Sequence, residues 1–228
     1  MLILPPTNEE DLLVRAQALA GQSLEQLAQR LAWPVPSDLR HAKGWPGELL
    51  ERALGATAAS LSEPDFMAIG VELKTIPISR SGRPKESTYI CTVPLKDTIG
   101  VDWETSPVRR KLARVLWIPV EAMAEIPLSQ RRIGMPLLWS PTPEQESILR
   151  ADFEELMDMV CLGQWDKLTA RYGRWLQIRP KATDSRALTR ATGPSGEAIL
   201  TLPRGFYLRT RFTAELLRSH YTGHYIVP

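Results

Sequence analysis

Hydrophobic residues recur with a helical period along the first quarter of the chain, and the pattern changes to short apolar runs typical of strands near residue 70. Each predicted helix has its own start signal. Capping boxes stand at Thr7–Glu10 and Ser23–Gln26, and Pro46 stands at the first position of a third helix. We therefore expect three helices. The first ends at about Ala20, the second at about Trp33 and the third at Leu54.

The later part of the chain predicts a sheet together with two further helices. A capping box at Thr142–Gln145 opens a long helix with an apolar stripe of Leu149, Phe153, Leu156 and Val160, and its acidic residues, Asp152 among them, would face water. The expected strands are 70–78, 87–94, 114–120, 174–178, 197–202 and 205–209, and a last helix covers 213–220. The pattern predicts one mixed α/β domain over residues 1–228, with lobes and no separable linker.

The segment Asp65–Lys74 carries the strongest candidate chemistry. Side chains two apart on a strand share a face, so Glu72 and Lys74 would stand together while Leu73 points the other way. Asp65 can join them only if the chain reverses, and residues 68–70 include a glycine that permits this. Two carboxylates can hold Mg²⁺, and a lysine can stabilise a phosphate oxyanion. A surface Glu–Lys pair on an edge strand would show the same short pattern.

Charge is unevenly distributed along the chain. Residues 165–228 carry 11 Lys or Arg against 4 acidic residues, whereas the remainder carries 17 against 22, although the net charge is only +2. A basic C-terminal part suits a surface that binds a polyanion, and a solvated surface of uneven charge is the alternative. Two cysteines and three histidines argue against a zinc cluster. We expect a cytoplasmic protein, because neither a membrane span nor a signal peptide is visible.

Several longer blocks fit one family together. They are residues 43–51 (KGWPGELLE), 65–77 (DFMAIGVELKTIP), 103–111 (WETSPVRRK), 115–121 (VLWIPVE), 177–182 (QIRPKA) and 202–208 (LPRGFYL). In these blocks the chain resembles the MutH family of DNA mismatch repair endonucleases over nearly its whole length. The blocks are far more specific than the Glu-x-Lys pattern alone.

The resemblance implies a restriction-endonuclease-like fold, a mixed sheet flanked by helices with two lobes around a DNA cleft. It implies a monomeric, Mg²⁺-dependent hydrolase that nicks the unmethylated strand at hemimethylated GATC sites. MutL would activate it after MutS has found a mismatch. The residues that match the family's catalytic group are Asp65, Glu72, Lys74, Glu51 and Lys111, of which Asp65 and Glu72 would hold the metal. Those on the DNA-binding side are Lys43, Tyr89, Arg179, Pro180, Lys181 and Tyr207.

By the same resemblance, Tyr207 lies near the adenine that carries the methyl mark, and Tyr89 stands where an aromatic side chain wedges between bases. Adenine presents its N6 amino group in the major groove, so a bulky side chain against N6 would clash once that nitrogen is methylated. Intercalating wedges are usually apolar, and Tyr89 adds a hydroxyl group. Packing within the sheet is the alternative role for both tyrosines.

Two other functions stay open on the sequence. A GATC-specific restriction endonuclease of the same fold would cut both strands, usually as a dimer and without MutL. The two N-terminal helices also resemble a helix-turn-helix, so a DNA-binding regulator without catalysis is a second alternative. A plain helical hairpin would explain those helices as well, and Glu51 could be a helix-surface acid. Lys111 could be one charge among several in residues 109–114.

Overall fold

The structure is a computed structural model that describes residues 3–37, 43–58, 63–96, 98, 100–169, 171–181 and 186–222. The chain divides into two compact units, and it passes between them more than once. The first unit comprises residues 1–86, 113–140 and 213–228, and the second comprises residues 87–112 and 141–212. The chain is therefore mixed α/β, as predicted, and each unit has its own sheet.

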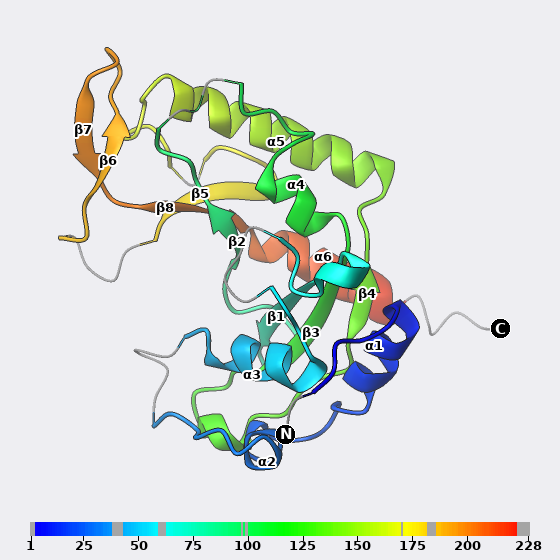
Figure 1. Cartoon of the computed structure of the whole chain (residues 1–228). Helices are drawn as coiled ribbons and strands as arrows, with labels where there is room; N and C mark the ends of the chain where they lie inside the picture. Colours follow the sequence, from blue (N-terminus) through cyan, green and yellow to red (C-terminus); the bar gives the residue numbers. More distant parts are fainter. Residues whose placement is uncertain are drawn as a thin grey trace. The chain divides into compact units, whose positions relative to one another are not determined.

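The first unit joins three N-terminal helices to a three-stranded sheet, seen in Figure 1 as the strands β1, β3 and β4. Its helices are α1 (Glu9–Gln17), α2 (Leu24–Arg30) and α3 (Trp45–Leu54). Its strands are β1 (Glu72–Ile78), β3 (Val115–Glu121) and β4 (Leu137–Trp139), with a short 3-10 helix η2 (Leu128–Gln130). β1 runs parallel to β3, and β4 runs antiparallel to β3.

The helices of this unit bury their apolar faces against one side of the sheet. Leu12, Leu27 and Leu50 of the three helices share one core with Leu73 of β1 and Leu116 of β3. Six consecutive residues of β3 are buried, so this strand is covered on both faces, as its continuous apolar run predicts. The core fixes the height and rotation of α3 relative to β1, and both elements carry candidate catalytic side chains.

The predicted start of the first helix is wrong by one residue. Asn8, not Thr7, is the N-cap, and its side chain accepts the backbone N–H of Asp11 at 2.8 Å. The carboxylate of Asp11 in turn accepts the backbone N–H of Thr7 at 3.0 Å. Asparagine and threonine are both favoured N-cap residues, so the sequence is compatible with a helix that starts after either one. The capping box at Ser23 is confirmed in full.

The second unit packs two helices against an antiparallel sheet of order β2-β8-β5. The sheet strands are β2 (Thr88–Thr92), β5 (Leu176–Pro180) and β8 (Arg204–Leu208). The helices are α4 (Pro107–Leu112) and α5 (Pro143–Cys161), and β6 (Thr189–Thr192) pairs with β7 (Ala198–Thr201) in a separate hairpin (Figure 1). The last helix, α6 (Thr210–Thr222), begins in this unit and has most of its residues in the first.

A chain of aromatic rings joins α5 to the sheet in the second unit. Phe153 of α5 lies 5.6 Å from Trp103 and 5.5 Å from Phe206 of β8, measured between ring centroids. The predicted apolar stripe of α5 is buried as expected. Because aromatic pairs of this kind add to the burial of their surface, these contacts hold β8 firmly under α5.

Asp152 contradicts the prediction that the acidic residues of α5 all face water. Its side chain is buried, and its two carboxylate oxygens accept the backbone N–H groups of Arg174, Trp175 and Leu176 at 2.6, 2.6 and 2.8 Å. A buried carboxylate needs such donors in place of water. Asp152 therefore fixes the point at which β5 begins.

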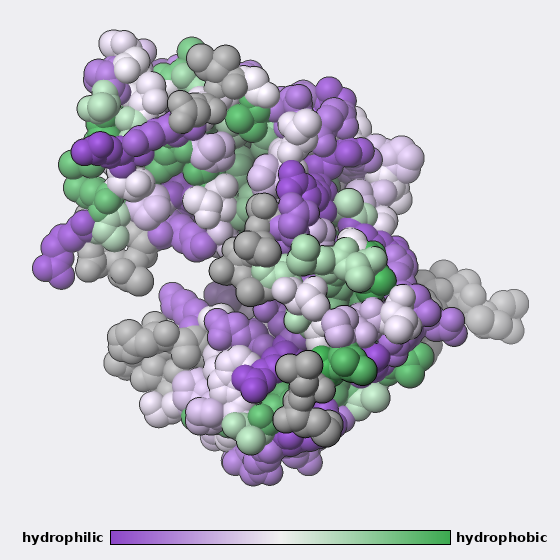
Figure 2. Space-filling model, in the orientation of Figure 1, coloured by the Kyte–Doolittle hydropathy of each residue, from purple (hydrophilic) through white to green (hydrophobic). Residues whose placement is uncertain are grey.

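Short elements account for most other differences. The sequence did not predict α4, β4 or β6, each of six residues or fewer. Figure 2 shows apolar residues in small groups among hydrophilic ones on the face that it draws. Within the described ranges, no helix is long and apolar enough to cross a membrane.

Candidate active site and DNA-reading face

The chain reverses between Asp65 and Glu72 within the first unit, as the glycine there predicted. A 3-10 turn, η1 (Met67–Ile69), is followed by Gly70 in the left-handed region at φ 66°. Phe66 and Val71 then pair as an antiparallel bridge, with the Phe66 N–H donating to the Val71 carbonyl at 2.9 Å. This reversal returns Asp65 to the start of β1, where its Oδ2 accepts the N–H of Leu73 at 2.8 Å.

Glu72 and Lys74 share one face of β1, as the strand alternation predicted. Lys74 Nζ donates to Glu72 Oε1 at 2.5 Å, and the Glu72 side chain is 1% exposed. Leu73 points the other way into the core beneath the helices. The pair is therefore not an exposed surface pair, and a buried ion pair of this kind is costly to break.

Glu51 approaches the same group from α3. Leu50 and Leu54 anchor this helix in the core, and Gly55 ends it in the left-handed conformation. The chain beyond the helix is tied to Asp65, whose carbonyl accepts the N–H of Thr57 at 2.9 Å. The pKa of Glu51 is raised to about 7, mainly by burial and next by the charge of Asp65; Lys74 opposes the shift, and Glu72 adds to it.

The charges around Glu51 also act on the pKa of Lys74. Burial alone would lower its pKa, but Glu72, Asp65 and Glu51 together raise the pKa above the ordinary lysine value. Three carboxylates thus act on one lysine, so a single positive charge faces three acidic groups.

An excess of carboxylate oxygens suits a hard divalent cation. In the part of the chain that the structure describes, no three metal-ligating side chains are already gathered within ligand distance of one point. Glu72 already shares one oxygen with Lys74 and Asp65 shares one with a backbone N–H. The donor set fits Mg²⁺ in its chemistry, because carboxylate oxygens are the ligands that a hard divalent cation takes.

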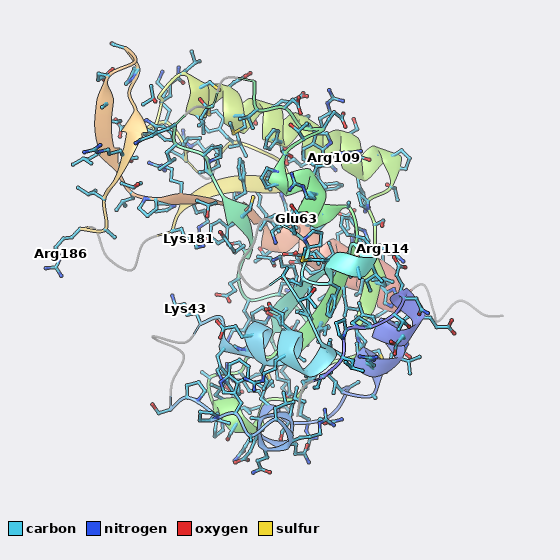
Figure 3. The ribbon with its side chains drawn as sticks, viewed as in Figure 1. Lys43, Glu63, Arg109, Arg114, Lys181 and Arg186 are labelled. Carbon is cyan, nitrogen blue, oxygen red and sulfur yellow. The ribbon has the colours of Figure 1, made fainter. Side chains whose placement is uncertain are left out.

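Lys111 of the predicted catalytic group and Lys43 of the predicted DNA-binding side stand on other segments of the chain. Lys43 is exposed and lies two residues before the start of α3 (Figure 3). Lys111 belongs to the second unit, where it is 8% exposed on α4 beside the buried residues Val108 and Leu112. The geometry of the first unit therefore brings together Glu51, Asp65, Glu72 and Lys74, and does not include Lys111.

Four of the predicted DNA-binding residues of the second unit, all but Pro180, meet on one face of its sheet. Tyr89 and Tyr207 are directly paired across β2 and β8, and their rings lie edge to face with centroids 5.4 Å apart. Lys181 Nζ lies 3.8 Å from the centre of the Tyr89 ring, and the Arg179 guanidinium lies 5.8 Å from that of Tyr207. Two cations thus flank two aromatic rings, an arrangement that can take both phosphates and bases.

A bulge in β2 builds part of this face. The register shifts between Tyr89 and Cys91, so Tyr89 pairs with Tyr207 while Thr92 pairs with Gly205. Tyr89 and Thr92 then lie on the same face although they are three residues apart, and their hydroxyl oxygens are hydrogen-bonded at 3.0 Å.

Sequence reasoning missed two polar partners on this side of the protein. One is Thr92, because only the bulge places it beside Tyr89. The other is Ser87, whose Oγ accepts a hydrogen bond from Arg179 Nη1 at 2.7 Å. Ser87 and Arg179 are 92 residues apart, so no local pattern could have paired them. Pro180, next to Arg179 at the end of β5, is exposed, and Figure 3 labels Lys181 just beyond it.

A mixed α/β protein with a buried carboxylate–lysine group on one strand and a basic aromatic face on another sheet has the parts of a phosphodiester-cleaving, nucleic-acid-binding enzyme. Similarity to known proteins supports assignment to this class of enzyme. The family model described as DNA mismatch repair enzyme MutH matches residues 54–152. The chain belongs to the MutH family.

Relatives support this assignment over nearly the whole chain. The chain is 56% identical over 217 residues to the DNA mismatch repair protein MutH of Yersinia enterocolitica serotype O:8, with 95% of each chain covered. The proteins of the same name from Yersinia pestis strain Pestoides F and Yersinia pseudotuberculosis serotype O:1b are similar to the same extent. The resemblance seen in the sequence blocks is therefore confirmed, and a non-catalytic regulator is excluded.

Proposed function

We propose that this protein is a Mg²⁺-dependent endonuclease with a restriction-endonuclease-like fold that nicks the unmethylated DNA strand at hemimethylated GATC sites. The observation that carries this proposal is the coupled group of Glu51, Asp65, Glu72 and Lys74 in a member of the MutH family. Three acids around one largely buried lysine have no evident use in a protein that only binds DNA, because binding a polyanion beside uncompensated carboxylates is unfavourable.

Each member of the group has a distinct role in this proposal. Asp65 and Glu72 would hold the cation, and Glu51 would either complete its ligands or orient the attacking water. A bound Mg²⁺ would polarise the scissile phosphate and lower the pKa of the attacking water. Lys74 stabilises the negative charge that develops on the phosphate, and Lys111 is proposed as a second such cation. The paired Glu72 keeps Lys74 protonated, because it raises the pKa of the lysine.

The basic aromatic face supports the reading of DNA. We assign Arg179, Pro180 and Tyr207 to the GATC bases, with Tyr207 against the adenine N6 group that methylation alters. Tyr89 is the proposed wedge between bases. Lys43 and Lys181 are exposed cations suited to phosphates, which provide affinity but little sequence information.

The partners follow from the repair function of the family. A protein with one active site that acts as a monomer leaves one strand intact, which is what strand-directed repair requires. We infer that MutL activates the nicking and that MutS acts upstream of MutL.

The test is cleavage of a supercoiled plasmid with one GATC site, in Mg²⁺ with MutL and in EDTA. Nicked circles in Mg²⁺ and none in EDTA would support the proposal. Linear product from unmethylated plasmid would favour the restriction endonuclease, because that enzyme cuts both strands. No metal-dependent breakage, with tight GATC binding retained, would overturn the catalytic assignment altogether.

A further inference from the structure

A glycine lies at the centre of the aromatic face of the second unit. Gly205 of β8 stands between Thr92 of β2 and Arg179 of β5 in the strand register. It precedes Tyr207 by two residues and therefore projects to the same face of the sheet. Phe206, between them, points into the core beneath α5. Gly205 thus occupies a position on the DNA-reading face where a side chain would stand among the rings.

The backbone does not require glycine at this position. Gly205 does not have a positive φ, so a residue with a side chain could adopt its conformation. A glycine inside a strand also lacks a side chain to pack and weakens the strand. The reason for a glycine here must lie in the space above it.

That space is filled by the two tyrosine rings. A Cβ atom on Gly205 would lie 2.8 Å from Cε2 of Tyr89 and 3.1 Å from Cε2 of Tyr207. The first distance is below any normal carbon–carbon contact. The ring of Tyr89 therefore lies directly over the backbone of β8, and this is possible only because Gly205 has no side chain.

Three other contacts hold Tyr89 in the same place. Its hydroxyl is bonded to Thr92, its ring meets Tyr207 edge to face, and Lys181 lies over the ring face. A methyl group at Gly205 would lift the ring and disturb all three contacts together. The effect of such a change would therefore pass through Tyr89.

We propose that Gly205 is a positioning residue for DNA recognition. Because it has no side chain, the ring of Tyr89 can lie over it and against Tyr207, and this placement sets where both rings meet the bases. This inference rests on the proposed function of the two tyrosines in DNA reading. It adds a residue that itself touches no base and acts only through the rings above it.

A double-mutant cycle tests the proposal, with Gly205→Ala, Tyr89→Ala and the combined variant. We expect Gly205→Ala to reduce the rate of nicking at hemimethylated GATC by about tenfold or more, because small misplacements of positioned groups are costly. In the Tyr89→Ala background, the same change should alter the rate by less than about twofold, because the displaced ring is already absent. Ala198→Val, at an exposed position of β7 in the same unit, is the control for added bulk.

The thermal unfolding midpoints of the four proteins give a readout that does not need activity. Gly205→Ala should lower the midpoint of the wild-type protein and leave that of Tyr89→Ala nearly unchanged. If Gly205→Ala fails to fold, the combined variant should fold again, since the clashing ring is gone. Equal losses in both backgrounds, or no loss in either, would overturn the proposal. If the wild-type protein does not nick DNA, the proposed function fails, but the unfolding cycle still decides the role of Gly205.

Discussion

The two candidate sites differ in how the chain builds them. The carboxylate–lysine group of the first unit is nearly local, because Asp65, Glu72 and Lys74 lie within ten residues and only Glu51 lies farther away along the chain. The aromatic face of the second unit takes residues from three strands that are far apart in the sequence. The first site is buried and dominated by charge, whereas the second is partly exposed and dominated by ring contacts.

This contrast predicts different responses to mutation. In the buried group, removing one charge leaves the others uncompensated, so both the chemistry and the stability of the first unit should change. On the aromatic face, single contacts are weaker and the loss of one is shared among its neighbours. The predictions below test this contrast, beginning with the largest expected effect.

Lys74→Ala should give the largest change in activity. We expect the nicking rate to fall by roughly a thousandfold, because the lysine is the proposed stabiliser of charge on the phosphate. Binding to a GATC duplex should stay close to that of the wild-type protein. Lys85→Ala is the matched control, since Lys85 is exposed in the same unit and its side chain donates to the backbone carbonyl of Ala122. A normal nicking rate for Lys74→Ala would remove it from the active site.

Glu51→Gln should change how the stability of the metal-free protein depends on pH. The pKa of Glu51 is about 7 in the folded protein, against 4.5 for an ordinary glutamate, so the folded state keeps this proton longer than the unfolded state. The wild-type protein should therefore lose stability as the pH rises from about 4.5 through 7, by up to about 3 kcal/mol.

In Glu51→Gln this loss should disappear, which makes the variant more stable than the wild-type protein at pH 8 and similar to it near pH 4.5. The measurement is denaturant unfolding in EDTA across this pH range. Glu48→Gln, at an exposed position of the same helix, should keep most of the wild-type slope. A parallel pH dependence for wild type and Glu51→Gln would contradict the raised pKa.

Asp152→Asn should destabilise the second unit by about 2 kcal/mol, because the amide cannot accept three backbone N–H groups as the carboxylate does. The aromatic face should also change, because β5 carries Arg179 and a displaced β5 would move that side chain. Asp158→Asn, at an exposed position of the same helix, should change the stability very little. The measurement is the thermal unfolding midpoint of the two variants. Equal midpoints would show that the hydrogen bonds of Asp152 to the backbone of residues 174–176 contribute nothing to stability.

Tyr89→Phe should have the smallest effect. It removes only the hydroxyl that bonds Thr92, so we expect a loss of stability below about 1 kcal/mol and a change in nicking rate of a few fold at most. The ring contacts with Tyr207 and Lys181 would remain. Thr92→Val removes the same bond from the other side and should match Tyr89→Phe in nicking rate. A large loss in only one of the two would show that the bond itself is not the cause.

The sequence predicted the parts that depend on local pattern. The reversal before β1 and the shared face of Glu72 and Lys74 followed from a glycine and a period of two. The capping box of α2 and the apolar stripe of α5 were equally visible.

The missed features all depend on contacts between distant segments. The pattern of its own helix predicts that Asp152 is a surface acid. Its burial is explained only by the backbone N–H groups at the start of β5, which donate to its carboxylate. The bulge in β2 exists only in the pairing with β8, so the bond between Tyr89 and Thr92 could not be predicted. The space above Gly205 is likewise visible only once both rings are placed.

The central claim is that the carboxylate–lysine group of the first unit is needed to cleave DNA and that the aromatic face of the second unit reads it. The most direct test measures, for Glu72→Ala and Arg179→Ala, the rate of strand-specific nicking of a hemimethylated GATC duplex and the dissociation constant for that duplex in EDTA. We predict that Glu72→Ala loses nicking and keeps its affinity for GATC, and that Arg179→Ala loses the preference for GATC over unrelated DNA. Near-normal nicking by Glu72→Ala, or an unchanged preference in Arg179→Ala, would contradict this division of roles.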